Sequence, residues 1–304
     1  MADMSVNVAG VQFKNPIITA SGTFGFGREY AELYELSRLG GVCCKGITAQ
    51  PRQGNPPPRI AETPGGILNS VGLQNPGVDK FIKFSLKWLM EQNTTVIANV
   101  AGFSMEEYCE IAEKLDETDI HMIELNISCP NVHHGGATFG TNCQAAAEIT
   151  AAVRAKTKKP LMVKLTPNVT SISEIALAVE AVGADAVSLI NTITGMKIDI
   201  NTHRPILTNN TGGLSGPCVL PVAVRMVSEV YRAVNIPIVG MGGVSNYKDA
   251  VELMLAGAAA VQVGTYNFTD PFGAPKIADD LAAYCEKSNL ASVSELVGKL
   301  ELYR

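Results

Sequence analysis

An apolar strand runs directly into polar residues in the stretch Glu124-Leu125-Asn126-Ile127-Ser128-Cys129-Pro130-Asn131. Pro130 halts regular structure, so Asn126 and Cys129 are expected side by side at the carboxyl end of the strand. In α/β enzymes this is the end that carries the chemistry. A thiol there is a candidate nucleophile, metal ligand or proton-transfer group, whereas the structural alternative is a buried cysteine that packs as a small hydrophobe.

Seven further runs resemble this strand, and most are continuously hydrophobic, as expected for parallel strands buried on both faces. The eight predicted strands are Pro16–Ala20, Gly41–Cys44, Thr95–Val100, Met122–Ile127, Pro160–Leu165, Ala186–Ile190, Ile236–Gly240 and Ala259–Val263. Helical patterns lie between them, over residues 104–115, 143–156, 171–182, 220–234 and 246–256, two of them opened by a capping box at Ser104 and at Ser171. This alternation predicts a (β/α)8 TIM barrel that forms a single domain over residues 1–304.

Two connections, residues 45–94 and 191–235, are too long for a plain crossover between parallel strands. A third, residues 128–142, is rich in glycine. All three leave from predicted carboxyl ends of strands. We therefore expect long loop insertions that cover one mouth of the barrel, where long loops are usually functional.

Composition excludes several classes of protein. The 304 residues are 46% hydrophobic and 17% charged, with a net charge of −5 and no run of Lys or Arg, which argues against a nucleic-acid partner. The start Met1–Ser5 lacks the pattern of a signal peptide, and charges such as Glu180 interrupt the apolar stretches before they reach the length of a membrane span. Seven cysteines with no C-x-x-C spacing suggest neither a disulfide framework nor a metal site. We expect a cytoplasmic protein without a membrane segment or bound metal.

Glycines follow the last two predicted strands, in Gly240-Met241-Gly242-Gly243 and in Gly264-Thr265. Glycine lets backbone N–H groups approach a phosphate, and a phosphate site after the seventh and eighth strands is common in this fold. Tight turns alone would explain either pair. The two pairs together, on these strands, favour phosphate.

Two lysines and four asparagines also fall at strand ends or in the mouth loops: Lys45, Lys164, Asn69, Asn99, Asn126 and Asn191. A lysine there could form a Schiff base, hold an anion or stabilise negative charge on a cofactor ring. A carboxamide offers both a donor and an acceptor, which suits the edge of a pyrimidine or flavin ring. The set predicts a polar pocket lined for a flat heterocycle.

At these motifs the chain resembles the soluble, FMN-containing dihydroorotate dehydrogenases, nearly from end to end. Residues 126–131 look like the catalytic loop of that family, and residues 68–77 look like its substrate loop. Residues 45–48, 54–59 and 135–140 are closest to the NAD-dependent, heteromeric subclass.

The resemblance implies a role for each candidate residue. Cys129 would take the C5 proton of dihydroorotate, while the C6 hydride passes to the flavin. Substrate would be bound by Lys45, Asn69, Ser70, Val71, Gly72, Leu73, Asn126, Asn191 and Thr192. FMN would be bound by Ser21, Lys45, Gly46, Asn99, Asn126, Lys164, Ile190, Gly216, Gly242, Gly243, Gly264 and Thr265, with Lys164 near N1 and O2 of the ring.

The resemblance also implies a partner. The chain shows no complete dinucleotide fingerprint and no cysteine cluster, so electrons bound for NAD+ would need a second protein. Heteromeric members of the family use a subunit with FAD and a 2Fe-2S cluster, in a heterotetramer built around a dimer of the catalytic chain.

Other interpretations remain open at this point. A homodimeric relative that uses fumarate shares the half-reaction, and a Schiff-base lyase would use Lys164 instead. A tRNA-modifying flavoprotein fits the barrel but not the acidic charge. A non-catalytic flavin carrier would leave Cys129 and the asparagines without a role.

Overall fold

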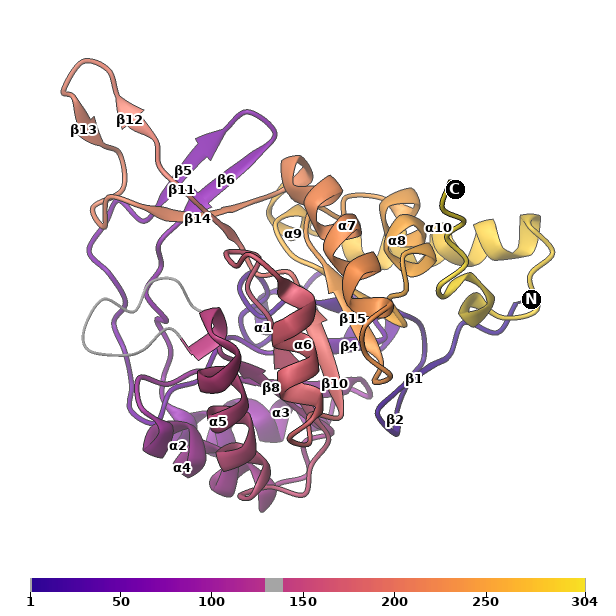
Figure 1. Ribbon diagram of the computed structural model, residues 1–304, viewed down its shortest axis with the longest axis horizontal. Coiled ribbons are helices and arrows are strands. Elements are labelled where there is room, and N and C mark those ends of the chain that lie inside the picture. Colours follow the sequence, from indigo (N-terminus) through magenta and orange to yellow (C-terminus); the bar gives the residue numbers. More distant parts are fainter. Residues whose placement is uncertain (1, 129–138, 304) are drawn as a thin grey trace.

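A closed barrel of eight parallel strands forms the centre of the chain, in a computed structural model that describes residues 2–128 and 139–303 (Figure 1). Around the barrel the order is β3, β4, β7, β8, β9, β10, β15 and β16, and β16 pairs with β3 to close it. The strands are β3 Ile17–Thr19, β4 Gly41–Cys43, β7 Thr95–Val100, β8 Met122–Asn126, β9 Leu161–Lys164, β10 Ala186–Leu189, β15 Ile238–Met241 and β16 Ala260–Val263. The predicted TIM barrel and its eight strands are confirmed.

The barrel strands are buried along their whole length, which explains their continuous apolar sequences. The exceptions are polar side chains that point into the barrel. Glu124 and Asn126 are two residues apart in β8 and therefore share one face of the strand. Neighbouring strands bring Asn99 opposite Glu124 and Lys164 opposite Asn126.

Helices surround the barrel and cover the outer faces of its strands (Figure 1). They are α1 Arg28–Ala31, α2 Val78–Lys80, α3 Lys87–Met90, α4 Met105–Asp116, α5 Cys143–Arg154, α6 Ile172–Glu180, α7 Leu220–Tyr231, α8 Tyr247–Leu255, α9 Tyr266–Thr269 and α10 Gly273–Lys287, with a wider helical turn at Phe81–Leu86 between α2 and α3. The side chains of Ser104 and Ser171 accept hydrogen bonds from the backbone N–H groups of Glu107 and Glu174, which is the serine half of each predicted capping box. The return half differs at Ser104, because the Glu107 carboxylate accepts from the Phe103 backbone N–H instead. Helix α10 was not foreseen, because it begins without a side-chain cap to mark its start.

The two longest connections pair with each other above the mouth of the barrel. Strands β5 (Ile60–Thr63) and β6 (Gly66–Asn69) come from the first, and β11 (Ile193–Gly195) and β14 (Gly212–Ser215) come from the second. They form one antiparallel sheet in the order β11, β14, β6, β5. Figure 1 shows this sheet on one side of the barrel, with the small hairpin of β12 (Ile198–Asp199) and β13 (Arg204–Pro205) projecting beyond it.

The amino-terminal hairpin of β1 (Val6–Val8) and β2 (Val11–Phe13) leads into the first barrel strand. The Phe13 ring is 1% exposed and packs against Gly41 at the start of β4, where a Cβ would lie 3.0 Å from the ring. This hairpin therefore covers the opposite end of the barrel from the mouth. Within the described residues, no helix is both long enough and apolar enough to cross a membrane.

Candidate functional site

A cavity of about 330 Å³ lies at the mouth, between the carboxyl ends of the barrel strands and the sheet above them. This volume falls in the range of small-molecule and cofactor sites. Eighteen residues that the sequence singled out line it: Ser21, Lys45, Gly46, Asn69, Val71, Gly72, Leu73, Asn99, Asn126, Lys164, Ile190, Asn191, Thr192, Gly216, Gly242, Gly243, Gly264 and Thr265. Residues separated by more than 240 positions in the chain thus meet at one site.

Two expected residues are not placed in the cavity. Ser70 is buried, and its hydroxyl accepts a hydrogen bond of 3.0 Å from the side chain of Asn55 instead. Cys129, the expected base, lies outside the described residues. Its neighbour Ser128 is the last described residue of the stretch and is 4% exposed.

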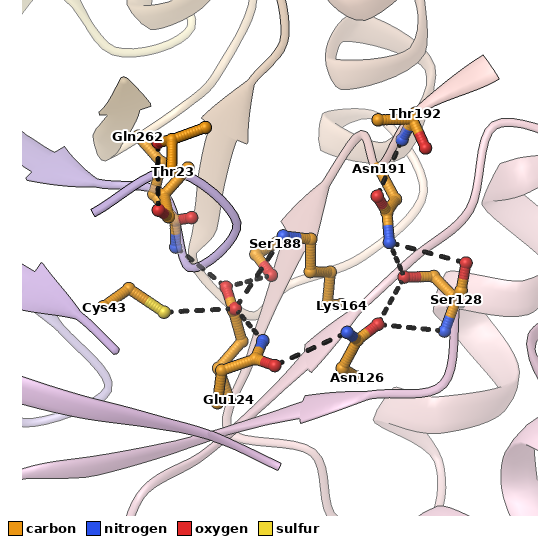
Figure 2. Close-up of polar contacts among 12 residues, drawn as sticks. Thr23, Cys43, Glu124, Asn126, Ser128, Lys164, Ser188, Asn191, Thr192 and Gln262 are labelled. Atoms are coloured by element: carbon orange, nitrogen blue, oxygen red, sulfur yellow. Dashed lines mark hydrogen bonds and ion pairs between the residues drawn. The ribbon is translucent and has the colours of Figure 1, made fainter. Parts of the chain in front are cut away.

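A buried carboxylate lies below the cavity and was given no role by the sequence. Glu124 is fully buried, and side chains from five other strands surround its carboxylate (Figure 2). Four of them donate hydrogen bonds to it: Asn99 at 2.5 Å, Gln262 at 2.8 Å, Ser188 at 2.9 Å and Cys43 at 3.2 Å. The fifth is Lys164, whose Nζ lies 3.9 Å from Glu124 Oε2.

The electrostatics of this cluster follow from burial and pairing. Burial alone would raise the pKa of Glu124, but the nearby Lys164 ammonium and the donated hydrogen bonds hold that pKa below its usual value. Burial and the Glu124 carboxylate together raise the pKa of the Cys43 thiol well above its usual range. Glu124 is therefore an anion that accepts, and Cys43 is a protonated donor.

A chain of hydrogen bonds leads from this carboxylate to the mouth loops, and every donor in it points toward Glu124. The Thr192 backbone N–H donates to Asn191 Oδ1 at 2.7 Å, and Asn191 Nδ2 donates to the Ser128 hydroxyl at 2.6 Å. That hydroxyl donates to Asn126 Oδ1 at 2.7 Å. Asn126 Nδ2 then donates to Asn99 Oδ1 at 3.4 Å, and Asn99 Nδ2 reaches Glu124. Three of the four asparagines predicted from sequence belong to one connected system.

Different physical reasons account for the glycines at the rim of the cavity. Gly242 and Gly243 have φ of 121° and 83°, and a Cβ on Gly243 would lie 2.7 Å from the backbone nitrogen of Leu220. Turn geometry and the approach of α7 therefore require glycine there. At Gly264 a Cβ would meet only Ala20, at 3.5 Å, so local packing leaves room for a side chain. Because protein packing does not require glycine at position 264, the free space beside the cavity indicates that a bound group takes the place of a side chain.

One acceptor in the cavity wall is left over. Gln262 is 1% exposed, and its Nε2 is used by Glu124, whereas its Oε1 has no hydrogen-bond partner among the described groups. Buried polar atoms are nearly always paired, so a ligand N–H in the cavity would satisfy it. Among the described residues, no group of three or more His, Cys, Asp or Glu side chains could hold a metal ion.

Three of the residues above were missed by sequence reasoning: Glu124, Ser128 and Gln262. Glu124 and Gln262 stand inside mostly apolar strands, and Ser128 comes two residues after the end of β8. A polar residue in or just after such a strand was the available signal. Their partners come from distant strands, which the sequence alone does not place.

Comparison with known proteins gives a consistent result. A family model described as dihydroorotate dehydrogenase matches residues 3–284. A protein of Parabacteroides distasonis is 57% identical over the whole of both chains, and it is named dihydroorotate dehydrogenase B (NAD(+)), catalytic subunit. Proteins of the same name from Alkaliphilus oremlandii and Bacteroides thetaiotaomicron are 54% and 53% identical, over 98% and 99% of this chain and 99% and 100% of their own.

Proposed function

The chain belongs to the dihydroorotate dehydrogenase family, and on this premise we propose that it oxidises dihydroorotate to orotate in pyrimidine biosynthesis, as the catalytic subunit of an NAD+-dependent enzyme. The proposal rests on similarity over the whole chain to relatives with this name. It is supported by a cavity at the barrel mouth that gathers two lysines and four asparagines, because such a lining suits a flat, polar heterocycle.

FMN is the cofactor that these residues fit. Backbone at Gly242, Gly243, Gly264 and Thr265 lines one part of the cavity and would hold the phosphate. Ser21, Gly46, Asn99, Ile190 and Gly216 would line the rest of the cofactor, and the unpaired Gln262 Oε1 offers an acceptor to a ring N–H. When bound, FMN supplies a hydride acceptor at its N5 position.

The chain's own residues would bind and orient dihydroorotate and remove its proton. The reaction forms the C5–C6 double bond, with the C5 proton leaving to a base and the C6 hydride to the cofactor. Cys129 is the proposed base, since the pKa of a free thiol, about 8.5, lies close enough to neutrality to be tuned. Asn69, Asn126, Asn191 and Thr192, with Lys45 and the 71–73 backbone, would hold the amides and carboxylate of the substrate.

Lys164 would counter the negative charge that the cofactor gains. Its side chain is 6% exposed and lines the cavity at the end of β9, where a fixed positive charge acts with little screening. Lys45 lines the same cavity and would contact both cofactor and substrate.

Electrons would leave through a second protein. The relatives are named as catalytic subunits, which supports a partner. We propose an electron-transfer subunit that carries FAD and a 2Fe-2S cluster, in a heterotetramer around a dimer of this chain. The chain alone is then expected to lack NAD+ reduction, and full activity with NAD+ in its absence would contradict the partner proposal.

The deciding experiment mixes the purified chain with L-dihydroorotate without oxygen and follows the flavin absorbance. Bleaching of a bound flavin is the expected result. A flavin that stays oxidised would contradict dihydroorotate as substrate, and a colourless protein would contradict FMN. Turnover with fumarate in place of NAD+ would favour the homodimeric alternative.

A further inference from the structure

Glu124 has no part in the proposed reaction, yet a fully buried carboxylate is too costly to be incidental. We propose that Glu124 is a positioning residue: it holds Asn99, the buried end of the hydrogen-bond chain that runs to Asn126, in one orientation, and it holds the Lys164 ammonium in place. The inference rests on the proposed function, because it assigns Glu124 an effect on the FMN and dihydroorotate sites.

Glu124 sets the direction of the chain at its buried end. Asn99 is the member of the chain that contacts the carboxylate, and its amide offers both a donor and an acceptor, so it could face Glu124 with either atom. An ionised carboxylate accepts only. Glu124 therefore requires Asn99 to present Nδ2 to it at 2.5 Å, which leaves Asn99 Oδ1 to accept from Asn126. At Asn126 and Asn191 the backbone N–H groups of Ser128 and Thr192, which can only donate, set the same direction, so both ends of the chain agree.

Three further donors hold the carboxylate itself still. Gln262 and Ser188 both donate to Oε1, and Cys43 donates to Oε2. These residues come from β16, β10 and β4, so the carboxylate is braced from several sides of the barrel. Because the carboxylate is held still, it can keep the Asn99 amide in one orientation.

The charge of Glu124 has a second consequence. Lys164 is the nearby cation, with Nζ at 3.9 Å, and Lys164 also lines the cavity. Glu124 offsets part of the positive potential that Lys164 projects into the site. Removing the negative charge would make electron uptake by a bound flavin more favourable, and its midpoint potential more positive.

The test compares the flavin-bearing chain with its Glu124→Gln variant, a substitution of nearly equal volume. We expect the midpoint potential of bound FMN to rise by about 30 mV or more, equivalent to a tenfold change in the equilibrium constant of a two-electron couple. We also expect the Kd for orotate, measured by calorimetry, to rise about tenfold, which is close to the worth of one hydrogen bond. Ser188→Ala is the matched control for the charge: it removes a donor to the same carboxylate but leaves the charge in place, so the midpoint potential should stay near wild type.

Glu124→Asp separates a charge role from a packing role. Asp keeps the charge but is shorter, so a purely structural role predicts that Asp disturbs the site more than Gln does. The proposal predicts instead that the midpoint potential of Glu124→Asp stays closer to wild type than that of Glu124→Gln, while orotate binding weakens. If Glu124→Gln does not fold, Glu124→Asp decides the matter by itself: the proposal requires weakened orotate binding with a midpoint potential near wild type, and a wild-type orotate Kd or a potential shifted by about 30 mV or more would overturn it.

The outcomes also separate this inference from the proposed function. A wild-type chain without flavin would overturn the proposed function, and this inference with it. A wild-type flavin bleached by dihydroorotate, with an unchanged potential and orotate Kd in Glu124→Gln, would overturn this inference alone.

Discussion

Asn191 donates a hydrogen bond of 2.6 Å from its side-chain amide to the hydroxyl of Ser128, a residue 63 positions earlier in the chain. This contact joins the loop after β10 to the end of the strand that precedes Cys129. Ser128 uses the same hydroxyl to donate to Asn126 at 2.7 Å. One small side chain thus connects two asparagines that line the cavity.

Ser128→Ala is expected to weaken orotate binding by up to about thirtyfold while FMN stays bound. The substitution removes both side-chain hydrogen bonds, and each lost bond of this kind costs about 1 kcal/mol. Calorimetric titration with orotate measures the effect. Ser104→Ala is the control for a general loss of stability, because it removes a helix cap on α4 that does not line the cavity. Equal orotate affinities in wild type and Ser128→Ala would refute the connection.

The barrel and much of its mouth could be predicted from sequence because their signals are local. Buried parallel strands read as short apolar runs, and polar residues at their ends mark the mouth. This was enough to bring Lys164, Asn99 and Asn126 to one site.

The sheet above the mouth could not be predicted in the same way. Strand β14 begins with Gly212-Gly213, which carry no side-chain pattern, and its pairing with β6 depends on two connections far apart in the chain. The role of Glu124 was hidden for a similar reason. Its polarity was visible in the stretch 124–131, but the donors that stabilise its charge come from five other strands.

Two glycines of the expected phosphate site should respond differently to alanine. Gly243→Ala is expected to lower the free energy of unfolding by at least about 1 kcal/mol, because φ is 83° and the new Cβ would lie 2.7 Å from Leu220. Gly264→Ala should unfold like wild type, since its Cβ meets only Ala20 at an ordinary 3.5 Å. If FMN phosphate lies there, however, FMN affinity should fall roughly tenfold. Urea unfolding and FMN titration of both variants measure these effects. A wild-type FMN affinity in Gly264→Ala would contradict a phosphate site at Gly264.

His121 is expected to make stability depend on pH near neutrality. Its Nδ1 accepts a hydrogen bond of 3.0 Å from the Val96 backbone N–H, and burial lowers the pKa of the imidazole. The unfolded chain therefore binds the proton first, and stability falls as pH drops below the unfolded value of about 6.5. His121→Asn keeps an acceptor oxygen near the position of Nδ1 but does not titrate. Urea unfolding at pH 7 and pH 5 should show a larger decrease for wild type than for the variant, and parallel decreases would exclude His121 as the cause.

Cys129→Ser tests the proposed base directly. A neutral serine hydroxyl is a far weaker base than a thiolate, and a positioned general base typically contributes about 10²–10⁴-fold to rate. We therefore expect anaerobic flavin bleaching by dihydroorotate to slow by about this factor, while FMN content and the orotate Kd stay near wild type. Cys109→Ser is the matched control, because Cys109 lies in helix α4 and does not line the cavity. If Cys129→Ser bleaches at the wild-type rate, the proton goes to another group. If both variants slow equally, the loss comes from a general effect of replacing a cysteine and not from the chemistry of Cys129.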